Sequence, residues 1–156
     1  RATIVTKYRK AWQPLQNEVV RILGSVGSPT STQQRRHQLR GIFEKVFYEL
    51  GKMHGAGVRH GHPHFANILV DEKGNIAFTD PKLLGDIKEK PNLPQKLGRK
   101  LEHFPSQGVG ADFDLQWLTA NMHAGKKLVI SLNWEVLGAA YKKGVALGKK
   151  RIAHLR

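Results

Sequence analysis

The chain has 156 residues, 40% of them hydrophobic, which fits one globular domain and excludes a disordered segment. It has no cysteine, so disulfide bonds and thiolate chemistry are excluded, and no apolar run approaches the roughly 18 residues that a transmembrane helix needs. The net charge of +14, from 26 Lys and Arg against 12 Asp and Glu, predicts attraction to nucleotides or to a polyanion such as nucleic acid or anionic lipid. Without disulfides or a signal peptide, a cytoplasmic location is expected.

The N-terminal part of the chain predicts a strand, a short helix and a loop. Residues Thr3 to Tyr8 are rich in β-branched side chains, which is typical of a short strand. Residues 17–23 have the composition of a short helix that ends at Gly24. The stretch that follows, residues 24–32, is rich in Gly, Ser and Pro and predicts a loop.

A long core helix is predicted over residues 32–56. Apolar side chains recur there at steps of three and four, which places them on one helical face: Leu39, Ile42, Phe43, Val46, Phe47, Leu50 and Met53. Ser31 and Gln34 have the spacing of a capping box at the start of this helix. Gly55 and Gly57 are expected to end it.

The second half of the chain predicts a β-hairpin and further helices. Residues 68–70 and 76–79 are β-branched and apolar, and the polar residues 71–75 between them predict a turn. Residues 81–110 contain prolines and glycines without periodicity and predict a long irregular loop with a functional role. Helices are expected in 111–156, at 114–122 and 134–147. Together these elements predict a single, mainly α-helical domain with a small β-hairpin, of the α+β class.

One segment carries a specific motif. Residues 58–70 read Val-Arg-His-Gly-His-Pro-His-Phe-Ala-Asn-Ile-Leu-Val. They resemble the catalytic loop of the protein-kinase-like phosphotransferases, H-G-D-x-H-x-x-N-I-L-V in many bacterial and small-molecule kinases, with matches at His60, Gly61, His64 and Asn67. Asp80, after the hairpin, falls where this family places the Asp of its D-F-G motif.

The resemblance extends to the flanks of the motif. Residues 50–57 resemble the end of the long helix of these kinases, and Thr3 to Tyr8 resembles the hinge strand that binds adenine. Asp114 resembles the Asp that anchors the catalytic loop, and residues 81–110 occupy the place of the activation segment. The resemblance therefore implies a kinase-like C-terminal lobe, with a reduced or missing N-terminal lobe because almost no sequence precedes the hinge strand.

The resemblance also implies an activity and its cofactors. A kinase-like phosphotransferase transfers a phosphoryl group from ATP to a hydroxyl acceptor, here of unknown identity, and needs Mg²⁺. Asn67 and Asp80 would hold this Mg²⁺, since the cation prefers oxygen ligands. His60, His64 and Asp114 would have structural roles around the catalytic loop.

Two positions depart from the family pattern. His62 stands where the catalytic Asp is expected, and Pro81-Lys82 follows Asp80 in place of Phe-Gly. An imidazole accepts a proton near neutral pH, so His62 is the candidate general base of a phosphotransferase whose activity is impaired. The alternative is a catalytically inactive pseudokinase that serves as a binding or scaffold module.

Two other interpretations stay open. His54, His60, His62 and His64 could together bind Zn²⁺ or Ni²⁺, since alternating residues on an extended segment share one face. The positive charge would also suit a basic nucleic-acid-binding protein. The three tryptophans are expected to be core or half-buried anchors and not a stacking platform for bases: Trp12, Trp117 and Trp134.

Overall fold

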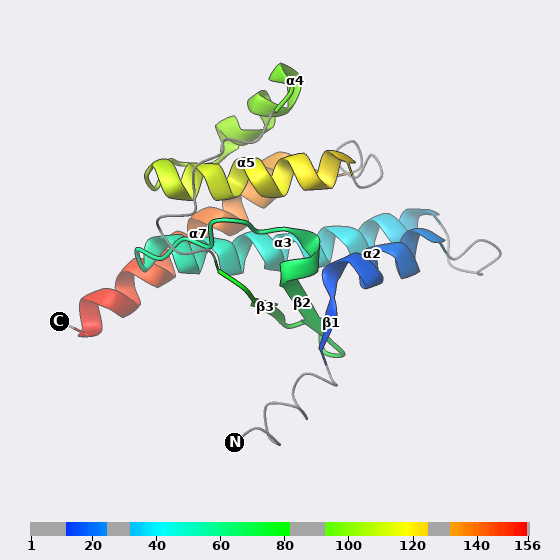
Figure 1. Ribbon diagram of the computed structural model, residues 1–156, viewed down its shortest axis with the longest axis horizontal. Coiled ribbons are helices and arrows are strands. Elements are labelled where there is room, and N and C mark those ends of the chain that lie inside the picture. Colours follow the sequence, from blue (N-terminus) through cyan, green and yellow to red (C-terminus); the bar gives the residue numbers. More distant parts are fainter. Residues whose placement is uncertain (1–11, 25–31, 82–92, 125–131, 156) are drawn as a thin grey trace.

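The computed structural model describes residues 12–24, 32–81, 93–124 and 132–155 (Figure 1). It is mainly helical with a small antiparallel sheet, so the predicted α+β class is confirmed. The elements in chain order are β1 (Trp12–Pro14), α2 (Leu15–Gly24), α3 (Thr32–Gly55), the 3₁₀ turn η1 (Phe65–Asn67), β2 (Ile68–Asp71), β3 (Ile76–Phe78), α4 (Gln95–Gly98), the 3₁₀ turn η3 (Arg99–His103), α5 (Val109–Ala124) and α7 (Trp134–Leu155).

Helix α3 is the core helix that the apolar periodicity predicts. It runs across the centre of the molecule, with α5 above it and the sheet below it in Figure 1. Phe43, Phe47 and Leu50 on its inner face are fully buried. The helix ends at Gly55, and Gly57 adopts a left-handed φ of 80° just beyond it, as expected of a helix-terminating glycine. The predicted cap at Ser31 and the strand at 3–8 lie outside the described residues.

Helices α3 and α7 pack backbone against backbone. Gly51 of α3 lies so close to α7 that an added Cβ would overlap the carbonyl oxygen of Tyr141. A Cβ on Gly144 of α7 would overlap the carbonyl oxygen of Tyr48 in the same way. Because side chains would separate these two backbones, glycine is required at both positions. The predicted helix at 134–147 is thus confirmed, and it continues to Leu155.

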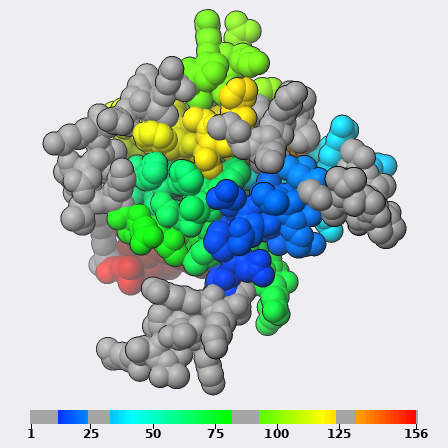
Figure 2. Space-filling view, turned by 45° about the vertical axis from the view of Figure 1, so that its right-hand side comes forward, coloured from blue at the N-terminus to red at the C-terminus, as the bar shows by residue number. Residues whose placement is uncertain are grey.

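The predicted hairpin is confirmed, and a third strand that the sequence analysis missed joins it. Strands pair antiparallel in the order β1-β2-β3, with Trp12 opposite Asp71 and Ile68 opposite Phe78. The missed strand β1 has three residues and ends at Pro14, which suits only an edge strand. Figure 2 shows β1 and α2 (blue) beside the green loop and hairpin on one face of the molecule.

The expectation of an irregular loop over residues 81–110 is wrong for residues 95–103 and 109–110, and residues 82–92 lie outside the described residues. Residues 95–103 form α4 and η3, and α5 begins at Val109, five residues before the predicted start. Pro94 is the N-cap residue of α4, and Leu97 anchors this short helix in the core. A helical segment this short has too few apolar residues to show a periodicity.

No helix in the described ranges is long and apolar enough to cross a membrane.

Candidate functional site

A buried carboxylate on α5 holds the loop that precedes η1. The Asp114 side chain is fully buried, and its Oδ2 and Oδ1 atoms accept hydrogen bonds from the backbone N–H groups of His60 and Gly61, each at 2.8 Å. His54 Nε2 donates a third bond to Oδ2, also at 2.8 Å. Three donors compensate for the cost of burying this group. Asp114 thus fixes the main chain of the loop at residues 60 and 61.

The network continues from His54 to helix α7. The Tyr141 hydroxyl lies 2.6 Å from Nδ1 of His54. In the neutral ring Nε2 carries the proton that goes to Asp114, so Nδ1 accepts from the tyrosine hydroxyl. Burial, together with the nearby carboxylates of Asp112 and Asp114, raises the pKa of Tyr141, which therefore keeps its proton.

His60 links the loop to the end of β3. Its ring is fully buried, and Nε2 donates to the carbonyl oxygen of Thr79 at 2.6 Å. Nδ1 accepts from the backbone N–H of His62 at 3.1 Å, so both ring nitrogens have partners and the tautomer is fixed. Thr79, the residue that accepts this bond, follows β3 and immediately precedes Asp80.

Asn67 and Asp80 lie at neighbouring ends of β2 and β3. The carbonyl oxygen of Asn67 accepts from the backbone N–H of Thr79 at 2.8 Å, and the Asn67 side chain donates to the carbonyl of His62 at 3.2 Å. Asp80 is exposed and has a left-handed φ of 53°, unlike any other non-glycine residue in the described ranges. This conformation is uncommon but accessible to Asp.

His62 packs against α5. Its ring meets Trp117 edge to face at a centroid distance of 5.0 Å and lies 5.4 Å from the His64 ring. These residues line a cavity of about 350 Å³ together with Pro63, Ala120 and Asn121. His62 is therefore half-buried between aromatic groups at the position where the motif predicts the base.

The site includes residues that the sequence analysis missed. Asn121 accepts a hydrogen bond from the backbone N–H of Phe65 at 3.0 Å and so holds η1 in place. Trp117 and Asn121 follow Asp114 by three and seven residues, which places all three on one face of α5. That spacing was visible in the sequence. Trp12 and Trp117 are half-buried and Trp134 is buried, as expected of anchors.

The four histidines of the proposed zinc or nickel site do not converge. His54 and His60 are buried and bonded to Asp114 and Thr79, while His64 caps η1 by accepting from the Ala66 N–H. Gly61 has a left-handed φ of 92°, which breaks the alternation that would align the histidines on one face. Across the described ranges no three His, Cys, Asp or Glu side chains are grouped for a metal ion. The expected alignment is therefore wrong.

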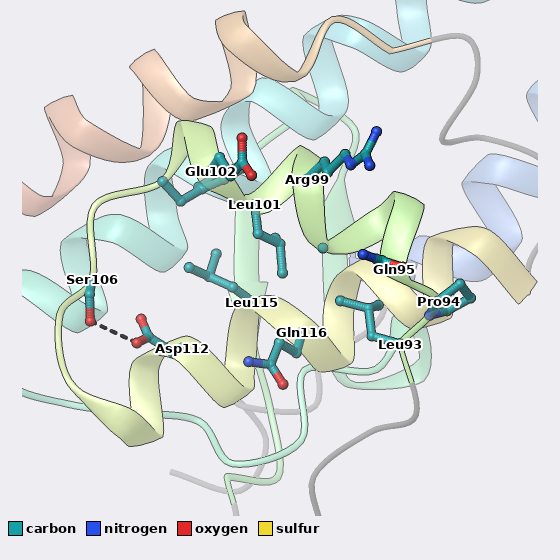
Figure 3. A pocket seen from close by; sticks show the side chains of 12 residues that line it. Leu93, Pro94, Gln95, Arg99, Leu101, Glu102, Ser106, Asp112, Leu115 and Gln116 are labelled. Atoms are coloured by element: carbon teal, nitrogen blue, oxygen red, sulfur yellow. Dashed lines mark hydrogen bonds between the residues drawn. The ribbon is translucent and has the colours of Figure 1, made fainter.

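A larger cleft of about 940 Å³ lies between α4, η3 and α5 (Figure 3). Leu93, Leu101 and Leu115 point into it, and Ser106 donates a hydrogen bond of 2.7 Å to Asp112 at its edge. None of the residues that the motif predicts as catalytic lines this cleft. Comparisons of the chain with protein-family models, with curated proteins and with solved structures find no match.

Proposed function

We propose that this chain is the large lobe of a kinase-like phosphotransferase, in which Asn67 and Asp80 bind the Mg²⁺ of a nucleotide and His62 takes the place of the catalytic base. The observation that carries the proposal is the bridge made by His60 between the loop and the residue before Asp80. This bridge joins the backbone of His62 to Thr79, the residue before Asp80, although 19 positions separate His60 from Thr79. Asn67 is bonded to the same two residues, through its carbonyl oxygen to Thr79 and through its side chain to His62. The substrate would be a nucleoside triphosphate and an acceptor with a free hydroxyl.

The donor atoms at the proposed cation site fit Mg²⁺. The Asn67 amide nitrogen donates to the His62 carbonyl, which leaves the amide oxygen as the ligand atom. Asp80 contributes a carboxylate that is exposed to solvent. Mg²⁺ is commonly held by one or two protein oxygens together with water and substrate phosphates, so two ligands suffice. The cation would neutralise charge on the phosphates during transfer.

His62 would act on the acceptor. As the phosphoryl group moves to the acceptor oxygen, the hydroxyl proton passes to a ring nitrogen of His62. The Asp114 carboxylate holds the backbone N–H groups of residues 60 and 61, and the His60 ring holds that of His62, so the imidazole starts from a fixed main chain. Positioning of this kind supplies much of the rate of phosphoryl transfer.

A second candidate is a binding module that retains nucleotide but does not transfer phosphate. The edge-to-face packing of His62 on Trp117 favours it, because a ring held in an aromatic contact has less freedom to meet an acceptor. Both candidates predict the same cation site at Asn67 and Asp80. They differ only in the role of His62.

Calorimetric titration with ATP, with and without Mg²⁺, tests the shared site. Asp80→Asn removes the charge but tolerates the left-handed backbone, so its loss of Mg²⁺-dependent affinity should reach about tenfold or more, equal to about 1.4 kcal/mol. Glu72→Gln removes an exposed charge from the nearby hairpin and should leave the affinity unchanged. Equal affinities for all three proteins would remove Asp80 from the site.

Phosphate transfer to small hydroxyl compounds and to mixed protein substrates separates the two candidates. A phosphotransferase should lose roughly 10²–10⁴-fold in rate in His62→Ala, the usual contribution of a general base. A binding module should show no turnover in any variant while retaining the Mg²⁺-dependent affinity. Turnover that is unchanged in His62→Ala would assign the proton transfer to another residue.

A further inference from the structure

Helix α7 carries a line of lysines on the side away from the core. Lys142, Lys143, Lys149 and Lys150 are all exposed. At 100° per residue they fall within an arc of about 120°, which we call the lysine face. Tyr141, a buried residue that contacts α3, lies on the opposite side of the helix. The lysine face therefore points to solvent, while the opposite side of the helix packs against α3.

The charges of the lysine face are not neutralised by neighbours. Within the described ranges no salt bridge joins any of the four lysines to a carboxylate, whereas Lys52 of α3 pairs with Glu49 at 2.9 Å. Glu135, the only acidic residue of α7, shares the arc but lies two turns before Lys142, about 10 Å away along the helix axis. Four like charges this close repel each other. An anion that binds to the face reduces this repulsion, and its binding is therefore favourable.

We propose that the lysine face of α7 binds the phosphate backbone of a nucleic acid without reading its sequence. This surface lies outside the proposed nucleotide site and does not depend on it. The two lysine pairs are seven residues apart, or about 10 Å along the helix axis, so one face presents charge to successive phosphates. No aromatic residue lies within the arc to stack on a base, which agrees with contacts to the backbone alone.

The residues between the lysines favour nucleic acid over a membrane. Ala139, Ala146 and Ala153 share the arc and are exposed, so small side chains allow a phosphate backbone to approach the helix closely. A helix that lies in a membrane interface inserts a bulky apolar face, but the apolar face of α7 is packed against the core. Leu155, which is 86% exposed, lies outside the arc.

The rigid mounting of the helix adds to this binding. The glycine contacts with α3 fix the middle of α7, from Tyr141 to Gly148, and its C-terminal end projects from the body of the molecule at the lower left of Figure 1. A helix that is already ordered loses little entropy when it binds. The lysines therefore meet a ligand from fixed positions, and only their side chains are immobilised.

Fluorescence anisotropy with a labelled RNA duplex of random sequence, over a range of salt concentrations, tests the proposal. The variant in which all four lysines of the face are changed to Gln should bind more weakly, and its log–log salt slope should be shallower by about 3 to 4, since each phosphate contact on a duplex contributes about 0.9. The matched control changes four exposed basic residues elsewhere, Arg36, Lys45, Lys73 and Lys96, to Gln and loses the same net charge. The control should keep the wild-type slope.

Three results would overturn the proposal. Equal losses in the two variants would show that overall charge, and not the lysine face, attracts RNA. Unchanged binding after removal of the four lysines would place the contact elsewhere. Binding to vesicles that contain phosphatidylserine, without binding to RNA at the same salt concentration, would assign the lysine face to a membrane surface. Circular dichroism and thermal unfolding confirm that each variant is folded.

Discussion

The loop held by Asp114 and the crossing of α3 with α7 are both buried, but they are stabilised in opposite ways. At the loop, one carboxylate collects N–H donors from His54, His60 and Gly61. At the crossing, Gly51 and its counterparts bring two backbones together because no side chain stands between them. The first region is damaged by removing polar atoms and the second by adding a single methyl group. Substitutions of similar size therefore separate the two kinds of stabilisation.

The largest effect is expected at Asp114. Asp114→Ala leaves two buried backbone N–H groups and the ring of His54 without their acceptor, and should reduce the free energy of unfolding by about 3–5 kcal/mol. Urea denaturation followed by circular dichroism measures this loss. Asp112→Asn, at a half-buried carboxylate of the same helix that keeps an oxygen to accept the bond from Ser106, serves as the control and should change stability by less than about 1 kcal/mol. Similar losses in both variants would contradict a special role for Asp114.

The next effect is expected at Gly51, with Gly41 of the same helix as its matched control. Gly51→Ala forces apart the backbones of α3 and α7 and should reduce the free energy of unfolding by about 1–3 kcal/mol or more. Gly41 has open space around its Cβ position, so Gly41→Ala should increase stability by up to about 1 kcal/mol through helix propensity. The opposite signs are measurable by thermal unfolding. Stabilisation by Gly51→Ala would rule out the close crossing.

Tyr141 joins the two regions and should show the smallest effect of the three. Tyr141→Phe removes the hydroxyl that bonds to His54 and should cost about 0.5–1.5 kcal/mol, whereas Tyr48→Phe, at a half-buried tyrosine of α3, should cost less. The imidazole resonances of His54 should shift in the NMR spectrum of the first variant only.

The same residue predicts a dependence of stability on pH. Because burial raises the pKa of Tyr141 in the folded state, the folded protein binds its proton more tightly than the unfolded chain does. This stabilisation is fully present below the unfolded pKa of about 10 and is lost as the pH rises above it. Urea titrations between neutral and alkaline pH should show a decline that is smaller in Tyr141→Phe. Identical declines in wild type and variant would exclude Tyr141 as the group responsible.

The sequence predicts those parts of the molecule that follow from local patterns. The core helix was visible in the periodicity that runs from Leu39 to Met53, and the hairpin in two short β-branched runs around a polar turn. The order of His60, Asn67 and Asp80 predicted which residues gather at the strand ends. In each case the residues that signal the feature lie close together in the chain.

Features that depend on distant partners could not be predicted. Strand β1 exists because β2 offers a free edge, and its three residues carry no pattern of their own. Tyr141 reaches His54 across 87 positions, and nothing in the sequence near either residue marks the pair. The left-handed turn at Gly61 was also not foreseen, and it breaks the alternation of side chains between His60 and His62. The rule that alternating residues share one face holds only for an extended backbone, so it fails at such a turn.

Asp114 holds the loop by its main chain, and this has a consequence for how the protein can change over evolutionary time. Both loop groups that the carboxylate binds are amide N–H donors, which every amino acid except proline provides. The contact of His62 with His60 likewise uses a backbone N–H. The shape of the loop is thus largely independent of the side chain at position 62. A histidine can replace an acid there, or be replaced by one, without loss of the loop conformation. The chemistry at this position can therefore change during evolution while selection maintains the fold.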